Sequence, residues 1–511
     1  MTKPSLIKIL FPLFFLIIII PQFFVQTGCA NIIPPEGGPR DSLPPVLRKA
    51  DPADSSLNFS DNKIMLVFDE YVNADNYLQE MIVSPVPLNM PTVTRKLNTV
   101  TVKLRDSLEP NTTYSINFGN TIKDVNEGNM MKNFTYIFST GRYLDSLQFT
   151  GNVLLAETGD VDTTLSVLLH KSDIDSALIK DKPRYVAKLD GHGHFRFKNL
   201  PPGTFYLYAL KDEGGSFRYM SKSQLFAFAD SAVVIGDSTK PVTLYAFAGA
   251  EKMPVSSTAS DQKNKKPGDK RLKFVTNLSA ERQDLLEKFV MTFETKLKDF
   301  DSSKVHFSTD TTFSPLSGFS WQLDSMRKKL SLDYPWQEDV MYNLVFEKDF
   351  ASDSLGQQLL KADTISFRAK SKRDYGKLIL RFRNLDLTKN PVLLFILNNE
   401  IKKSYPLNDA SFSQQLFPPG EYHLRILNDK NKNGVWDPGV FFGERQQPEL
   451  VKPLQRAINV RPNFDNTFDI DVNAVAVPED KQKMQQSNPG QQPAQNQGPR
   501  NRPSTTRPPR F

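Results

Sequence analysis

Residues 195–212 read FRFKNLPPGTFYLYALKD, and residues 412–429 read FSQQLFPPGEYHLRILND. The two stretches align without a gap. In each, a strand-like segment leads into Pro-Pro-Gly, and the segment that follows alternates apolar and polar residues with a period of two. Proline fixes φ and glycine permits a positive φ, so the turn between the strands is chemically specified. The chain therefore contains an internal repeat built from β-strands.

A second repeat lies upstream of each copy. The apolar strand that ends at Phe68 resembles the one that ends at Phe293, and the strand around Tyr114 resembles the one around Tyr342. A further strand closes each copy. The order along the chain is therefore A-B-A-B, with about one hundred residues in each module, which is the usual size of a small β-sandwich. Only residues 280–288 suggest a helix.

The bulk composition excludes several classes of protein. A chain of 511 residues holds several domains, and 37 Phe with 36 Pro suits short strands joined by turns. The formal charge of +7 is small for this length, and no segment of the body concentrates basic residues as a nucleic-acid binder would. With a single cysteine, no disulfide within the chain is possible, so apolar cores alone must hold the modules together.

That cysteine, Cys29, follows a basic start with Lys3 and Lys8 and an apolar stretch from residue 9 to residue 25. This order is typical of a secretory signal peptide. The residues before Cys29 resemble a lipobox, which implies cleavage before Cys29 and attachment of lipid to it. The match departs from the usual pattern at Gln26, where Leu is common. A transmembrane anchor and an ordinary secretory peptide are the alternatives.

The modules resemble known families. The A modules resemble the SbsA-type bacterial Ig-like domain, through Phe68-Asp69-Glu70 and the segment from Leu108 to Gly141. The B modules resemble carboxypeptidase-regulatory-like or prealbumin-like sandwiches, through the Pro-Pro-Gly repeat. The chain up to Val477 resembles a Bacteroidota lipoprotein family that begins with Cys29-Ala-Asn and continues with PPEGGPRDS at residues 34–42. That family implies no settled biochemical activity.

We therefore expect an all-β fold of tandem β-sandwiches in a row, in the order Ig-like, prealbumin-like, Ig-like, prealbumin-like, with a disordered C-terminal tail. The expected divisions are a lipoprotein signal peptide at 1–28, a lipidated stalk at 29–45, an Ig-like domain at 46–142, a prealbumin-like sandwich at 143–249, a linker at 250–271, a second Ig-like domain at 272–371, a second prealbumin-like sandwich at 372–477 and a disordered basic tail at 478–511.

The best constellation for chemistry is DKNKNGVWDPG at residues 429–439. Oxygen-bearing side chains alternate around Gly434 as in the first nine positions of an EF-hand calcium loop. Val440 stands at the twelfth position, where a bidentate Glu belongs, and Glu444 could substitute. The alternative is a turn in which Asn and Asp cap their own backbone. The expected calcium ligands are Asp429, Asn431, Asn433, the Val435 carbonyl and Asp437.

Two other candidate sites are better explained by ordinary structural roles. His192 and His194 sit in a Gly-rich turn without a third ligand nearby, so we interpret them as turn residues and not as a metal site. Asp69 and Glu70 are adjacent in a strand and point to opposite faces, so they do not form a carboxylate pair. No serine-hydrolase, zinc-protease or P-loop motif occurs, and a lipidated cysteine excludes thiol catalysis. The sequence therefore predicts no enzyme and no small-molecule substrate.

Asp-Ser followed by an apolar residue resembles the O-glycosylation pattern of Bacteroidota, which implies modification at Ser42, Ser107, Ser146 and Ser176. Asp-Ser is also common in turns, which is the alternative. Arginines of the C-terminal tail could contact anionic lipid or a partner, or could simply keep the tail solvated.

Together these observations predict a non-enzymatic outer-membrane lipoprotein that acts as a binding or scaffolding subunit of a cell-envelope complex, in outer-membrane protein assembly or secretion. A surface adhesin for carbohydrate or matrix is the alternative. The expected partners are the membrane, through lipid on Cys29, and a protein, with no nucleic acid. Because the residues after Cys29 lack an acidic run that resembles a surface-export signal, we favour the periplasmic face. Calcium is the one candidate cofactor.

Overall fold

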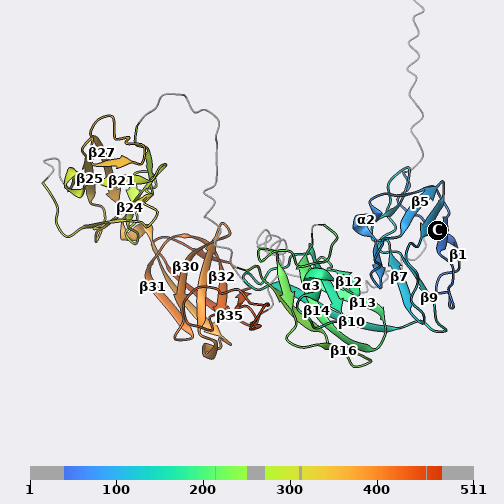
Figure 1. Ribbon diagram of the computed structural model, residues 1–511. Coiled ribbons are helices and arrows are strands. Elements are labelled where there is room, and N and C mark those ends of the chain that lie inside the picture. The colour runs from blue at the N-terminus through green and yellow to red at the C-terminus, as the bar shows by residue number, and fades with distance from the viewer. Residues whose placement is uncertain (1–39, 213, 250–270, 310–313, 456, 475–511) are drawn as a thin grey trace, which may run out of the picture. The chain divides into compact units, whose positions relative to one another are not determined.

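The computed structural model describes residues 40–212, 214–249, 271–309, 314–455 and 457–474 (Figure 1). Cys29, most of the expected stalk and linker, and the tail at 478–511 lie outside these residues, so the expectations about them stay predictions. The described chain is nearly all β-strand, and its many separate sheets confirm the predicted all-β fold of tandem sandwiches. It forms two compact units that divide between Leu144 and Asp145.

In the part of the chain that the structure describes, helical elements are few and short. They comprise two α-helices of four residues each, α2 (Tyr77–Glu80) and α3 (Ala177–Lys180), and three 3-10 turns, η1 (Ser302–Lys304), η2 (Lys372–Asp374) and η3 (Leu387–Lys389).

The first unit is an Ig-like module with three sheets, ordered β1-β2-β6-β5, β4-β7-β9 and β3-β8. Its core contains the buried aromatic side chains of Phe68, Phe118, Tyr136 and Phe138. Residues 40–45, expected as stalk, contact this module, because Arg40 donates to the Glu127 carbonyl and Pro45 is buried. Its strands are β1 (Leu47–Asp51), β2 (Lys63–Phe68), β3 (Val72–Ala74), β4 (Ile82–Ser84), β5 (Thr92–Lys96), β6 (Thr99–Lys103), β7 (Thr113–Asn117), β8 (Ile122–Asp124) and β9 (Thr135–Ser139).

The second Ig-like module has the same three sheets with one strand more, β19: β18-β20-β24-β23, β19-β27-β25-β22 and β21-β26. Its separate core includes Phe289, Phe307, Tyr342 and Phe346. Its strands are β18 (Phe274–Thr276), β19 (Arg282–Gln283), β20 (Phe289–Phe293), β21 (Leu297–Phe300), β22 (Val305–Ser308), β23 (Ser320–Leu323), β24 (Lys329–Asp333), β25 (Met341–Phe346), β26 (Ala351–Asp353) and β27 (Asp363–Ala369).

The helix expected at residues 280–288 is wrong. Ala280 and Glu281 adopt positive φ angles of 50° and 58°, which an α-helix does not tolerate. β19 then runs parallel to β27, with Gln283 opposite Ala369, and the Gln283 side chain is buried. Pairing with a strand distant in the sequence overrides the weak local helix preference of this segment.

The two prealbumin-like modules also share one topology. The first has sheets β13-β10-β17 and β12-β11-β14-β15, with β16 on β14, and the second has β31-β28-β35 and β30-β29-β32-β33, with β34 on β32. In both, the first and last strands pair in parallel. The strands are β10 (Leu147–Leu155), β11 (Leu165–His170), β12 (Tyr185–Lys188), β13 (His194–Leu200), β14 (Gly203–Lys211), β15 (Phe226–Phe228), β16 (Val233–Ile235), β17 (Val242–Ala246), β28 (Gly376–Arg383), β29 (Pro391–Leu397), β30 (Glu400–Pro406), β31 (Ser411–Phe417), β32 (Gly420–Asn428), β33 (Leu450–Pro453), β34 (Ile458–Val460) and β35 (Asp465–Asp471).

The Pro-Pro-Gly segments connect the strands that the sequence predicted, β13 to β14 and β31 to β32. Gly203 and Gly420 have φ angles of 157° and 155°. The two strands that each segment connects belong to different sheets. Each segment is therefore a corner between the two layers of a sandwich and not a hairpin. Proline suits such a corner because it has no N–H to leave unpaired where pairing stops.

The five-stranded sheet of each prealbumin-like module is apolar on both faces. In the first module, Leu168, Tyr208 and Phe226 lie opposite the core face and are nevertheless buried. In the second, the corresponding face carries a small apolar cluster that includes Leu394 and packs against Trp436. A sheet buried on both faces needs a cover on its outer side, and the segment between β32 and β33 supplies part of it in both modules.

Candidate functional site

The predicted cation loop occupies the start of the long connection between β32 and β33, directly after a strand. Asp429 begins it, and its side chain is buried, with 1% of the residue's surface exposed. One carboxylate oxygen accepts from the backbone N–H of Lys432 at 2.6 Å and the other from that of Gly434 at 2.7 Å. Hydrogen bonds to backbone N–H groups offset the desolvation of this buried carboxylate and fold the loop around it.

The remaining predicted side chains converge on Asp437. The amide nitrogens of Asn431 and Asn433 lie 2.6 and 2.7 Å from the same carboxylate oxygen of Asp437. The Val435 backbone N–H donates to the Asn433 side-chain oxygen at 2.7 Å, while its own side chain is exposed. The structure thus brings Asn431, Asn433 and Asp437 together. The buried Asp429 carboxylate holds the backbone of the same loop through its hydrogen bonds.

Glu449 completes this loop, and the sequence reasoning missed it. Its side chain is buried, and its two oxygens accept from the backbone N–H groups of Lys430 at 2.6 Å and Asp437 at 3.1 Å. Its carbonyl accepts from the Trp436 indole at 2.8 Å. Glu444, which we considered for this role, is exposed instead. Glu449 lies too far along the chain for any spacing rule of calcium loops to have indicated it.

The donor set of the loop suits a hard cation, since carboxylate and amide oxygens are the ligands that calcium takes. The side-chain amides would present oxygen in place of nitrogen by a half-turn about their last bond. As the loop stands, however, backbone and amide N–H groups satisfy the carboxylates. Within the described residues, no group of three or more His, Cys, Asp or Glu side chains is arranged to hold a metal. Calcium binding at this loop therefore stays a prediction.

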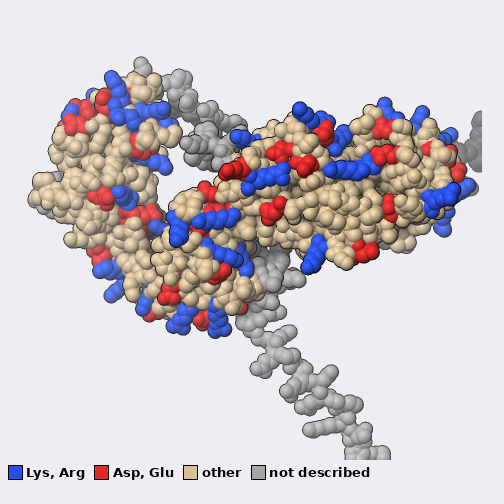
Figure 2. Space-filling model, turned by 60° about the horizontal axis from the view of Figure 1, so that its bottom comes forward, with Lys and Arg blue, Asp and Glu red and all other residues tan. Residues whose placement is uncertain are grey.

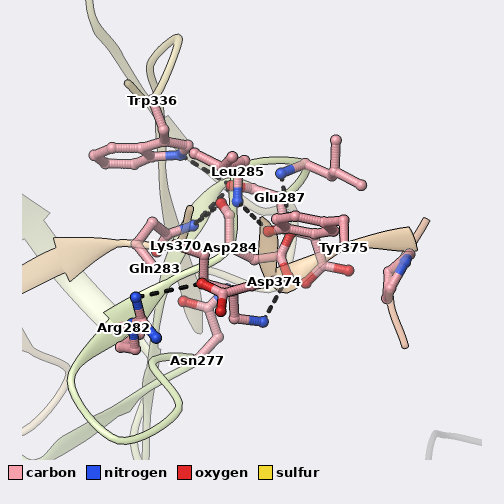
Figure 3. Close-up of polar contacts among 12 residues, drawn as sticks. Asn277, Arg282, Gln283, Asp284, Leu285, Glu287, Trp336, Lys370, Asp374 and Tyr375 are labelled. Atoms are coloured by element: carbon pink, nitrogen blue, oxygen red, sulfur yellow. Dashed lines mark hydrogen bonds and ion pairs between the residues drawn. The ribbon is translucent and has the colours of Figure 1, made fainter. Parts of the chain in front are cut away.

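A second polar cluster lies where the second Ig-like module continues into the second prealbumin-like module (Figure 3). Lys370 Nζ lies 2.9 Å from the Asp284 carboxylate, and the Tyr375 hydroxyl accepts from the Leu285 backbone N–H at 2.7 Å. The Trp336 indole donates to the Glu287 carbonyl at 3.0 Å. Burial and the hydrogen bond to the Asp284 side chain raise the pKa of Tyr375, and bonds from Lys370 and Leu286 outweigh burial and lower the pKa of Asp284. These contacts join the 284–288 turn to both modules.

An open depression of about 520 Å³ lies beside this cluster. Its lining mixes apolar and polar side chains, and the apolar ones include Leu285, Leu286, Trp336 and Leu416. Two lining residues with charged side chains, Glu338 and Lys372, form an ion pair with each other at 3.2 Å. The contacts of the cluster connect the second Ig-like module to the second prealbumin-like module.

The other residues singled out in the sequence are dispersed. His192 and His194 are exposed in a turn, where their backbone N–H groups donate to Asp190. Asp69 accepts from the Val46 backbone N–H at 2.8 Å, whereas burial and the negative charge of Asp124 raise the pKa of Glu70. Each is explained by local structure. The four serines of the expected glycosylation sites are all exposed, as modification requires: Ser42, Ser107, Ser146 and Ser176.

Comparison with known protein families supports an Ig-like fold for the first module. Residues 41–140 match the bacterial Ig-like domain family. A search of curated proteins found no match. No helix of the described residues is long and apolar enough to cross a membrane.

Similar solved structures include three bacterial proteins. The TIE protein of Bacillus anthracis is 9% identical, with a TM-score of 0.17, over 86% of this chain and 75% of that one. The S-layer protein SbsC is 13% identical, with a TM-score of 0.15, over 82% and 41%. The major pilin subunit BcpA of Bacillus cereus is 10% identical, with a TM-score of 0.16, over 63% and 99%. Scores this low carry no conclusion about function.

Proposed function

We propose that this protein is a non-enzymatic, lipid-anchored outer-membrane protein that acts as a binding or scaffolding subunit of a cell-envelope complex, such as one for outer-membrane protein assembly or secretion. The match to the bacterial Ig-like family fits a structural or adhesive role in the envelope or at the surface. The signal-peptide pattern that ends at Cys29 supports the anchor.

The proposal of a non-enzymatic role rests on how the buried acidic side chains are hydrogen-bonded. Asp124 and Asp353 are buried at corresponding turns of the two Ig-like modules, and each accepts backbone N–H bonds. Burial alone would raise the pKa of each carboxyl, but these hydrogen bonds outweigh it and lower the pKa. Catalytic carboxylates instead converge on a pocket with their pKa values driven apart. Asp124 and Asp353 serve instead as turn anchors.

The surface charge supports a protein partner over nucleic acid. Figure 2 shows Lys and Arg side chains interspersed with Asp and Glu over the face in view. A nucleic-acid groove would gather one sign of charge. We favour the periplasmic face of the outer membrane, on the absence of an acidic run after Cys29.

Affinity purification of the full-length protein from native membranes, with mass spectrometry, tests the proposal. We expect a small set of envelope proteins to co-purify in near-equal amounts with the parent and to be lost with Cys29→Ala, which should not reach the membrane. Purification without any such partner, together with binding of carbohydrate or matrix by intact cells, would favour the adhesin. Protease added to intact cells should spare the protein if it faces the periplasm.

A further inference from the structure

Residues 439–447 extend from the second prealbumin-like module onto the first, and we call them the docking arm. Phe441 is buried, with 5% of its surface exposed. Its ring centroid lies 5.0 Å from that of Phe226, 5.2 Å from that of Phe228 and 5.8 Å from that of Tyr208. These three side chains stand on the outer face of the first module's five-stranded sheet. The arm therefore covers an apolar face of a different module.

Polar contacts set the orientation of the arm. The Gln447 amide donates to the Phe228 carbonyl at 2.9 Å and to the Asp230 carboxylate at 2.8 Å. The Arg445 guanidinium pairs with Asp175 and lies 4.8 Å from the Phe441 ring centroid. Bonds to both backbone and side chains of the first module give this contact a defined register.

The contact between the two modules continues beyond the arm. The Val451 backbone N–H donates to the Ala156 carbonyl at 2.8 Å, and Arg425 pairs with Asp160 at 2.9 Å. A Cβ atom added at Gly159 would lie 2.3 Å from the Pro453 ring, so the two backbones approach too closely for any side chain there. Aromatic packing, charge pairs and close backbone approach together are typical of a stable interface.

We propose that the docking arm makes the two prealbumin-like modules a non-covalent pair, which holds residues 145–474 together independently of the chain that links them through residues 250–270. The partner that fits the outer face of the first module's sheet is thus the arm of the same chain. The grouping of residues from Asp145 onward into one compact unit agrees with this. The proposal does not depend on the scaffolding role.

The energetics favour a persistent pair. An aromatic side chain buries about 150–250 Å² and dominates the stability of the contacts that it makes. Without the arm, Tyr208, Phe226 and Phe228 would form an exposed apolar patch of a kind that soluble modules avoid. Phe441 sits at the centre of these partners, where truncation to Ala weakens an interface most.

Cleavage of the full-length protein tests the proposal. A protease recognition sequence placed within residues 250–270 allows the chain to be cut into two fragments, each with one Ig-like and one prealbumin-like module. We expect the fragments to remain together on size-exclusion chromatography and to give a one-to-one complex by native mass spectrometry. With Phe441→Ala and Gln447→Ala, their dissociation constant should rise about tenfold or more.

Phe464→Ala is the matched control, because Phe464 belongs to the same module, is 61% exposed and lies outside the arm. It should leave the fragments paired. Hydrogen exchange on the uncut chain separates loss of docking from unfolding: Phe441→Ala should increase exchange at β15 and leave the β10–β17 pairing protected. Three results would overturn the proposal: separation of the parent fragments on cutting, pairing unaffected by the arm substitutions, or concentration-dependent dimers of the uncut chain that the arm substitutions abolish.

Discussion

Phe441 packs its ring 5.0 Å from that of Phe226, although the whole second Ig-like module lies between the two residues in the sequence. The two prealbumin-like modules therefore contact each other directly, although they are not neighbours in the sequence. The cause is the outer face of a five-stranded sheet that is apolar on both sides and needs a cover. The covering segment begins where the candidate cation loop ends.

Cys29→Ala should abolish lipid attachment and release the protein from membranes, because one thiol carries the proposed anchor. Fractionation and labelling with a palmitate analogue measure this. Ser42→Ala serves as the control, since it changes a nearby residue without touching the thiol. A Cys29→Ala protein that still fractionates and labels like the parent would rule out the lipoprotein interpretation.

Asp124→Ala should lower the free energy of unfolding of the first Ig-like module by about 3 kcal/mol, because three backbone N–H groups lose a charged acceptor. Asp61→Ala, at an exposed position of the same module, should change it by less than about 0.5 kcal/mol. Chemical denaturation measures both. An equal effect of the two substitutions would mean that the buried turn contributes nothing special.

The lowered pKa of Asp124 also fixes the sign of its pH dependence. A carboxyl whose pKa is lower in the folded state contributes stability above its unfolded pKa, and this contribution is lost as pH falls through the folded value. The parent should therefore lose more stability between neutral pH and pH 3 than Asp124→Ala does.

His170→Leu should make the second unit less sensitive to mild acid. Burial lowers the pKa of His170 from 6.5 to about 4, although Asp181 acts in the opposite direction. Its Nε2 has no hydrogen-bond partner among the residues that the structure describes, and its ring lies 5.7 Å from that of Tyr208, itself a contact of Phe441. Since the unfolded chain takes up the proton first, stability is complete above about pH 6.5 and declines towards pH 4, by roughly 3 kcal/mol in all.

Thermal unfolding of the parent, His170→Leu and His192→Leu between pH 4 and pH 7 measures this. His192 is exposed and serves as the control. If the acid sensitivity of the His170→Leu protein equals that of the parent, folding does not lower the pKa of His170.

Calcium at ten millimolar should stabilise the second prealbumin-like module by about 1–3 kcal/mol, if the loop binds it in the range of about 10⁻⁴ to 10⁻³ M known for extracellular modules. The double change Asp429→Ala and Asp437→Ala should remove this increase. Calorimetry with and without calcium measures it, and the comparison within each variant separates binding from the structural loss that Asp429→Ala itself causes.

Asp409→Ala with Asp469→Ala removes two exposed carboxylates of the same module and is the matched control. No calcium-dependent change in the parent would leave Asp429, Asn431, Asn433, Val435 and Asp437 as turn residues only. In that event Glu449 would be a structural cap of the loop and nothing more.

Much of the local structure could be predicted from the chain. Period-two alternation indicated β14 and β32, and Pro-Pro-Gly indicated a turn before each, because these signals depend on neighbouring residues alone. The alternation of oxygen side chains from Asp429 also indicated a tight loop. Glu449 could not be found this way, because it reaches the loop only after the chain has passed through the docking arm and returned to β33.

The sequence by itself determined that this protein is a succession of β-sandwich modules, since alternation, turn residues and repeats act over a few neighbouring positions. It also carried a signal that was not used: Leu165–His170 and Pro391–Leu397 are almost continuously apolar, which is typical of strands covered on both faces. Only the tertiary structure decided what covers them. Burial of an apolar face is favourable against any apolar surface of suitable shape, so the sequence pattern shows only that the face must be covered. The path of the chain in three dimensions decides that Phe441 covers it.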